Sequence, residues 1–150
     1  MRKSGRERQT ESVIKVASSP TIIPVLLVDD QSGVRRGLRM RLELESDIKV
    51  VGEAEDGPGA LEALEAVGPC VIVLDYEMEG MNGIEVVDAL RGAGKRPVIV
   101  MLTIHDNALL KQAAVLAGCR DFVAKHEPSE RLLAAIRRAG ADLRTGETAA

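Results

Sequence analysis

The feature that most constrains the fold is a series of five short apolar runs, each followed by a segment with helical periodicity. The runs begin near residues 25, 48, 71, 98 and 121. Those at 25–28, 71–74 and 98–102 are continuous and rich in β-branched side chains, which is typical of strands buried on both faces of a parallel sheet. Five strand-then-helix units predict an α/β fold with right-handed crossovers. A leucine-rich repeat has a similar period, but its Leu-x-x-Leu-x-Leu signature is absent.

Between the runs, apolar residues recur on one face of each expected helix. They are Val34, Leu38 and Leu42, then Leu61, Leu64 and Val67, then Ile84, Val87 and Leu90. The helix expected at 108–117 differs, because its apolar residues spread over a wider arc than the covering of a sheet requires. Either this helix is deeply seated in the core, or it leaves an apolar margin for a partner.

Composition argues against nucleic-acid binding by the folded part. Tyr76 and Phe122 are the only aromatic residues, so bases would find no stacking platform. Residues 1–19 carry five Lys and Arg against two Asp and Glu, which leaves 15 basic against 21 acidic side chains elsewhere. An acidic body lacks the clustered cations that contact phosphates. We interpret residues 1–21 as a flexible basic arm, either a solvated tail or a contact for an anionic partner.

The sequence predicts a cytoplasmic protein. No apolar run approaches the length of a membrane-spanning helix, and no apolar segment of a signal peptide follows the basic start. Cys70 and Cys119 lack metal-ligand spacing, so we expect two reduced core thiols that are not bridged to each other.

Polar residues stand at the carboxyl ends of the predicted strands, where parallel sheets bind ligands. The first strand ends in Asp29 and Asp30, the third in Asp75, and the fourth in Thr103, while the fifth runs into Lys125. In the strand order 2-1-3-4-5, the first and third strands are neighbours and the three carboxylates share one crevice. Like charges raise one another's pKa values unless a cation neutralises them, and Mg²⁺ prefers such oxygen ligands. We therefore predict a Mg²⁺ site.

A carboxylate beside bound Mg²⁺ is a plausible nucleophile toward a phosphate donor. Thr103 and Lys125 then supply a hydroxyl and an ammonium for the oxygens of the transferred group. Taken singly, each residue has an ordinary explanation: an Asp pair caps a helix, Thr103 ends a strand, Lys125 is solvated, and His105 lies in a loop. Their joint placement at one edge of the sheet favours a functional site.

Five segments, in order and spacing, resemble the response-regulator receiver domain. They are 25–30, 50–57, 71–83, 101–106 and 117–125, within a match from Ile23 to Ala139. The amino-acid sequence of these segments is most similar to receivers of the helix-turn-helix transcription-factor branch. The resemblance implies a flavodoxin-like (βα)5 domain at 22–140, with a doubly wound sheet of strand order 2-1-3-4-5 and a short tail at 141–150.

The resemblance also implies the chemistry. Asp75 would accept a phosphoryl group from a phosphohistidine on a sensor histidine kinase or phosphotransfer protein. Asp30 and Asp75 would bind Mg²⁺ directly, the backbone carbonyl of Glu77 would be a further ligand, and Asp29 would act chiefly through water. Such a chain is a signalling module whose own chemistry is limited to self-catalysed phosphotransfer and slow autodephosphorylation.

The same resemblance implies how the signal leaves the site. Thr103 and Lys125 would hold the phosphoryl oxygens, and Phe122 occupies the aromatic switch position whose ring moves inward when the threonine is drawn toward the phosphoryl group. The surface from the helix at 108–117 to the last helix would then bind a downstream protein or support a phosphorylation-dependent homodimer.

Two departures from the family pattern matter. Glu79 stands where the family usually has Pro, so we expect a looser, more acidic loop. Glu77 and Glu79 place two extra negative charges near Asp75, which should tighten cation binding and make small anionic phosphodonors react less readily. The twelve residues after Arg138 are too few for a helix-turn-helix module. The chain is therefore either a stand-alone receiver or a fragment of a DNA-binding regulator whose output domain is absent.

Other functional classes fit the sequence less well. A phosphohydrolase with an aspartyl nucleophile needs Asp-x-Asp on the first strand, and Asp29-Asp30 lacks the spacer. A pseudo-receiver that only binds protein would be expected to lack Asp75, Thr103 or Lys125, and all three are present. Neither a Gly-x-Gly-x-x-Gly motif nor a P-loop occurs, which argues against dinucleotide and nucleotide binding.

Overall fold

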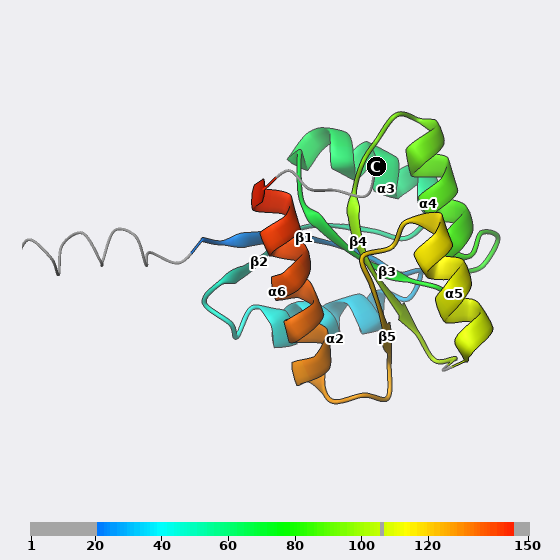
Figure 1. Cartoon of the computed structure of the whole chain (residues 1–150). Helices are drawn as coiled ribbons and strands as arrows, with labels where there is room; N and C mark the ends of the chain where they lie inside the picture. Colours follow the sequence, from blue (N-terminus) through cyan, green and yellow to red (C-terminus); the bar gives the residue numbers. More distant parts are fainter. Residues whose placement is uncertain (1–20, 106, 146–150) are drawn as a thin grey trace, which may run out of the picture.

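The computed structural model describes residues 21–105 and 107–145, and within them strands alternate with helices (Figure 1). The elements are β1 (Ile23–Val28), α2 (Ser32–Leu42), β2 (Ile48–Ala54), α3 (Gly57–Val67), β3 (Val71–Asp75), α4 (Gly83–Gly92), β4 (Val98–Thr103), α5 (Ala108–Ala117), β5 (Asp121–Ala124) and α6 (Ser129–Thr145). All strand pairs are parallel, in the order β2-β1-β3-β4-β5. The predicted α/β fold, flavodoxin-like topology and strand order are confirmed.

The sheet is covered on both faces, with α2 and α6 on one and α3, α4 and α5 on the other (Figure 1). Alternate residues of each strand serve the two layers. Val25 and Leu27 pack with the cluster under α2 and α6, whereas Leu26 and Val28 pack with the cluster under α3, α4 and α5. This double burial explains why the strand sequences are continuous apolar runs rather than alternating ones.

Helices α3, α4 and α5 each begin after a residue whose side chain caps the helix, namely Asp56, Asn82 and Asn107. The Asn82 side chain accepts a hydrogen bond from the Glu85 backbone, and the Glu85 side chain accepts one from the Asn82 backbone, so α4 starts with a capping box.

The last helix, α6, continues to Thr145, beyond the domain end expected at residue 140, and Leu143 still packs against the core. The arm at 1–21 lies outside the described residues except for Thr21, as does the tail from residue 146.

Helix α5 spans Ala108–Ala117, as predicted, but it is not deeply seated. Ala114 is its buried residue, whereas the side chains of Leu109 and Leu116 are 80% and 87% exposed. The wide apolar arc in the sequence therefore corresponds to an exposed apolar margin on the surface and not to a deeply seated helix.

The two cysteines are free and buried, which confirms that they are not bridged to each other. Burial raises the pKa of the Cys70 and Cys119 thiols to about 12. Both thiols therefore stay protonated at neutral pH and are poor nucleophiles. Within 21–105 and 107–145, no helix has the length and apolar character needed to cross a bilayer.

Substituting Gly83 by Ala is expected to destabilise the protein. A Cβ there would lie 2.6 Å from the Met101 sulfur and 3.0 Å from both the Asp75 carbonyl oxygen and the Tyr76 Cα, so the end of β3 would have to move. We expect the free energy of unfolding to fall by about 1 to 3 kcal/mol in urea titrations. The control is Gly92→Ala, where a Cβ meets nothing within 4 Å and Ala should add up to about 1 kcal/mol. Equal stability of Gly83→Ala and wild type would contradict the close packing.

Candidate functional site

Three carboxylates meet at the point where the connections from β1 and β3 leave for opposite faces of the sheet. One potential ligand atom each from Asp29, Asp30 and Asp75 lies within 4.8 Å of the other two. Asp29 and Asp75 are buried, while Asp30 is partly exposed. The structure thus brings together the predicted acidic residues, at the position where open α/β sheets bind ligands.

Backbone hydrogen bonds orient two of these carboxylates. Asp29 Oδ1 accepts from the Gln31 N–H at 2.9 Å, and Asp30 Oδ2 accepts from the Glu79 N–H at 2.9 Å. Each residue keeps one buried oxygen, Oδ2 of Asp29 and Oδ1 of Asp30, with no hydrogen-bond partner. Buried carboxylate oxygens left in this way suit a hard divalent cation such as Mg²⁺.

The loop after β3 contacts the acidic cluster through the backbone of Glu79. The backbone N–H of Glu79 ties the loop after β3 to Asp30 at the end of β1. Proline has no N–H and would be unable to make this bond. The residue that departs from the family pattern therefore adds a link to the acidic cluster.

Lys125 is the positive charge in the cluster. Its Nζ lies 2.9 Å from Asp75 Oδ1 and 3.7 Å from Asp29 Oδ2. Burial, together with the charges of Asp29 and Glu77, raises the pKa of Asp75 to about 6, although Lys125 acts in the opposite direction. Burial alone would lower the pKa of Lys125, but Asp75 and Asp29 outweigh it and raise that pKa. At neutral pH Asp75 is therefore mostly ionised and Lys125 is charged.

The hydroxyl of Thr103 is hydrogen-bonded to the side chain of Glu77. The Thr103 hydroxyl donates to Glu77 Oε2 at 2.5 Å, and the Ile104 N–H donates to Glu77 Oε1 at 3.3 Å. His105 Nε2 lies 3.5 Å from the same Oε2. Sequence reasoning had considered the backbone carbonyl of Glu77 and the charge of its carboxylate, but it missed the contacts of that carboxylate with Thr103 and Ile104. The available signal was the adjacency of the two strand ends, where Asp75 pairs with Leu102.

Arg35 is a second residue that sequence reasoning missed. Its Nη1 donates to the Asp29 backbone carbonyl at 2.5 Å, while its Nε donates to Glu53 at 2.8 Å. The guanidinium thereby connects the end of β1 to the edge strand β2. Arg35 thus supports the backbone that carries the first carboxylate.

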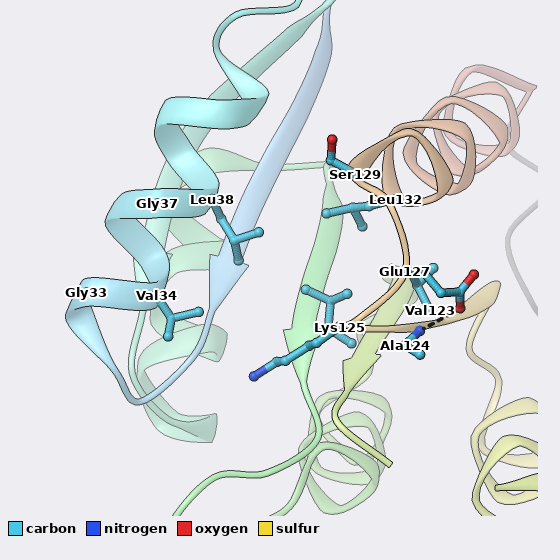
Figure 2. A pocket seen from close by; sticks show the side chains of 11 residues that line it. Gly33, Val34, Gly37, Leu38, Val123, Ala124, Lys125, Glu127, Ser129 and Leu132 are labelled. Carbon is cyan, nitrogen blue, oxygen red and sulfur yellow. Dashed lines mark hydrogen bonds between the residues drawn. The ribbon is translucent and has the colours of Figure 1, made fainter. Parts of the chain in front are cut away.

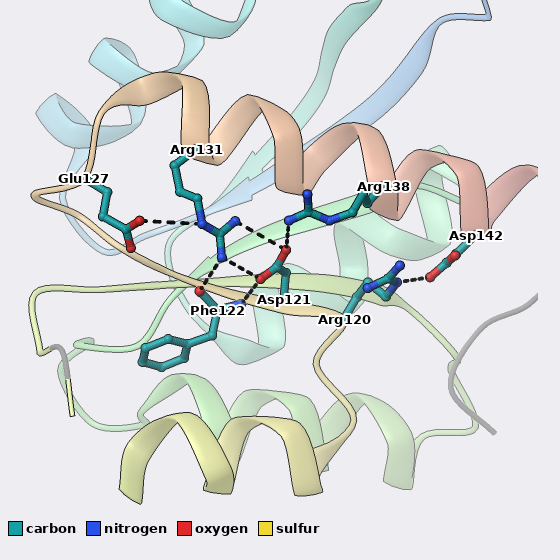
Figure 3. Close-up of polar contacts among 7 residues, drawn as sticks. All are labelled: Arg120, Asp121, Phe122, Glu127, Arg131, Arg138 and Asp142. Atoms are coloured by element: carbon teal, nitrogen blue, oxygen red, sulfur yellow. Dashed lines mark hydrogen bonds and ion pairs between the residues drawn. The ribbon is translucent and has the colours of Figure 1, made fainter. Parts of the chain in front are cut away.

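Phe122 and Asp121 leave β5 toward opposite faces of the sheet (Figure 3). The Phe122 ring is buried on the side of α5, in the cluster that also contains Ala114. Burial alone would raise the pKa of Asp121, but hydrogen bonds from Arg131 and Arg138 of α6 lower it to about 2. The start of β5, next to the predicted switch residue, is therefore firmly paired with α6.

An apolar pocket lies beside the acidic cluster, between α2, β5 and the start of α6 (Figure 2). Its volume is about 330 Å³, and Lys125 forms part of its lining. Gly33 and Gly37 line the α2 side, and a Cβ at either position would meet nothing within 4 Å. The pocket therefore remains open along α2.

The chain matches the family model described as "Response regulator receiver domain" over residues 25–137. The nitrate/nitrite response regulator NarP of Escherichia coli is 40% identical over 117 residues, which are 78% of this chain and 54% of NarP. LiaR of Bacillus subtilis is 36% identical over 118 residues, which are 79% of this chain and 56% of LiaR. The chain thus spans about half the length of these curated relatives.

Solved structures agree with the sequence matches. The receiver domain of NarL from Mycobacterium tuberculosis superposes with a TM-score of 0.74 at 31% identity, covering 81% of this chain and 98% of that one. A LuxR-family response regulator from Aurantimonas sp. SI85-9A1 gives a TM-score of 0.76 at 29% identity, covering 81% and 86%. With the fold, the acidic cluster and Lys125 in place, these matches show that the chain belongs to the response regulator receiver domain family and is similar to receivers of its NarL and LuxR branch.

Proposed function

We propose that this chain is a phosphoacceptor receiver of a two-component phosphorelay. Asp75 takes a phosphoryl group from the phosphohistidine of a sensor histidine kinase or phosphotransfer protein. The observation that carries the proposal is the grouping of buried Asp75 with Lys125 at 2.9 Å and with two carboxylates that each keep an oxygen without a hydrogen-bond partner.

Each residue of the site has a distinct role in the transfer of the phosphoryl group to Asp75. A carboxylate oxygen of Asp75 forms the new bond to phosphorus while the bond from phosphorus to the donor nitrogen breaks, and that nitrogen keeps the electron pair. Lys125 stays charged and attracts the phosphoryl oxygens. Asp30, Asp75 and the Glu77 backbone carbonyl would hold Mg²⁺, and Asp29 would act on it through water. Bound Mg²⁺ would neutralise the carboxylates and the incoming phosphoryl oxygens.

The surroundings of the site suit two protein partners. The open apolar pocket is lined in part by Lys125, whose Nζ lies 2.9 Å from Asp75 Oδ1, so we assign the pocket to the phosphodonor protein. The output surface runs from α5 to α6, where Leu109 and Leu116 offer an apolar margin to a downstream protein or a second receiver. Phe122 would couple the phosphorylation site to the output surface by moving with Thr103. The likeness to the transcriptional regulatory protein LiaR of Bacillus subtilis and the probable transcriptional regulatory protein NarL of Mycobacterium tuberculosis favours an output that controls transcription. We assign the protein to the cytoplasm.

Intact mass spectrometry tests the proposal directly. After incubation with acetyl phosphate and Mg²⁺, the protein should gain the mass of one phosphoryl group, and hydroxylamine should remove it, as expected for an acyl phosphate. With EDTA in place of Mg²⁺ the gain should disappear. A protein that stays unmodified both with acetyl phosphate and with a phosphorylated histidine phosphotransfer domain is not a phosphoacceptor.

Two substitutions at Glu79 separate its charge from its N–H. Glu79→Ala removes the charge and keeps the hydrogen bond to Asp30, whereas Glu79→Pro removes both. We expect Mg²⁺ to bind more weakly to each variant than to wild type, and most weakly to Glu79→Pro, because Asp30 then loses the donor that orients it. Fluorescence of Tyr76, the only tyrosine in a chain without tryptophan, reports the titration. Equal affinities of the two variants would show that the N–H does not position Asp30.

A further inference from the structure

The Glu77 carboxylate is bound to the Thr103 hydroxyl, which we assign to the phosphoryl oxygens, and to the adjacent Ile104 N–H. We propose that, in the unphosphorylated protein, the Glu77 carboxylate occupies the positions of two phosphoryl oxygens and must be displaced before Asp75 is phosphorylated. This inference rests on the proposed function and assigns Glu77 a positioning role that slows the reaction. The contacts that carry it are Thr103 Oγ1 to Oε2 at 2.5 Å and Ile104 N to Oε1 at 3.3 Å.

The donors at this position are fully used. A hydroxyl has one proton to donate, and the Thr103 proton goes to Glu77. The Thr103 oxygen also accepts from the His105 N–H at 2.9 Å. The Ile104 N–H likewise has a single proton, directed at the second Glu77 oxygen. A phosphoryl group on Asp75 therefore gains neither donor unless Glu77 releases it.

The carboxylate imitates a phosphoryl group in charge as well as in geometry. It presents two anionic oxygens to a hydroxyl and an N–H, and hydrogen bonds with an ionised partner are about twice as strong as neutral ones. His105, with Nε2 3.5 Å from Oε2, lies against the same carboxylate on its outer side. The bonds to Glu77 are therefore of the same charge-assisted kind that a phosphoryl group would form with these donors.

The same carboxylate is free to leave. The Glu77 side chain is 26% exposed, in contrast to the buried Asp29 and Asp75. A rotation of its side chain toward solvent exchanges the Thr103 and Ile104 bonds for bonds to water, without moving the backbone carbonyl proposed to bind Mg²⁺. Displacement therefore needs only a change of rotamer.

Phosphorylation rates of matched variants test this inference. The proteins are wild type, Glu77→Gln, Glu77→Ala and, as the charge control, Glu79→Ala, whose exposed side chain belongs to the same loop. With acetyl phosphate and saturating Mg²⁺, we expect Glu77→Ala to react about tenfold or more faster than wild type, because a charged hydrogen bond no longer has to be broken. Glu77→Gln, which keeps an uncharged acceptor, should be intermediate.

The salt dependence of the rates distinguishes competition by Glu77 for the hydrogen-bond donors from charge repulsion between the loop and the phosphodonor. Glu79→Ala should react about two to three times faster at low salt and lose this gain at 1 M salt, where the Debye length is about 3 Å. The gain of Glu77→Ala should persist at 1 M salt. If Glu77→Ala is no faster than Glu79→Ala, or if salt removes both gains, the inference is wrong.

A binding measurement keeps this result distinct from the proposed function. Beryllofluoride with Mg²⁺ imitates a phosphoryl group without a chemical step, and the Ile104 amide resonance reports its arrival. Glu77→Ala should bind beryllofluoride about tenfold more tightly than wild type, for the same reason. A wild-type protein that is never phosphorylated would overturn the proposed function, whereas equal beryllofluoride affinities would overturn only the role of Glu77.

Discussion

The Asp75→Asn protein is expected to gain no phosphoryl group under conditions that modify the wild-type protein fully. Asn keeps the size of the side chain, but its amide is not a nucleophile toward phosphorus. We expect the initial rate to fall by at least about a thousandfold, as is usual when a nucleophile is removed.

The matched control is Asp88→Asn, the same chemical change on the exposed side of α4. This variant should be phosphorylated at the wild-type rate. Intact mass gives the extent of modification, and peptide mapping gives its position. A hydroxylamine-sensitive adduct on Asp75→Asn at the wild-type level would assign the phosphorylation to another residue and refute the role of Asp75.

The substitution Asp75→Asn is also expected to stabilise the metal-free protein. The pKa of Asp75 rises from 3.8 to about 6, mainly because the ionised carboxylate is buried near Asp29 and Glu77. Above pH 6 Asp75 is ionised in the folded protein, and the burial of this charge lowers the free energy of unfolding. In the unfolded chain the same carboxylate is solvated. Since one pKa unit corresponds to about 1.4 kcal/mol, we expect Asp75→Asn to exceed wild type by up to about 3 kcal/mol in unfolding free energy at pH 8.

The pH dependence gives the sign of this effect. Between about pH 6 and 3.8 the folded wild-type protein binds a proton at Asp75 more tightly than the unfolded chain, so its stability rises as the pH falls. The advantage of the Asn variant should therefore shrink through this window and vanish near pH 4. Urea unfolding in EDTA at several pH values measures it. A difference that is absent, or constant from pH 4 to 8, would contradict the burial of an ionised carboxylate.

The sequence by itself determined the architecture and the composition of the site. Continuous β-branched runs indicated strands buried on both faces, and their alternation with helical segments indicated a doubly wound parallel sheet. In such a sheet all strands end at the same edge, so Asp29, Asp30, Asp75, Thr103 and Lys125 were predictable as neighbours from their positions alone. This part of the inference needs only strand periodicity and direction.

Only the tertiary structure decided how these groups are connected. The Glu77 carboxylate binds Thr103, the Glu79 N–H binds Asp30, and Arg35 binds the Asp29 carbonyl. The exposure of α5, which the apolar arc left open, was settled in the same way. These contacts depend on the path of short loops and on side-chain rotamers, where a shift of about 1 Å makes or breaks a hydrogen bond. A pattern of residue types carries no information at that scale, because many loop paths satisfy the same hydrophobic periodicity.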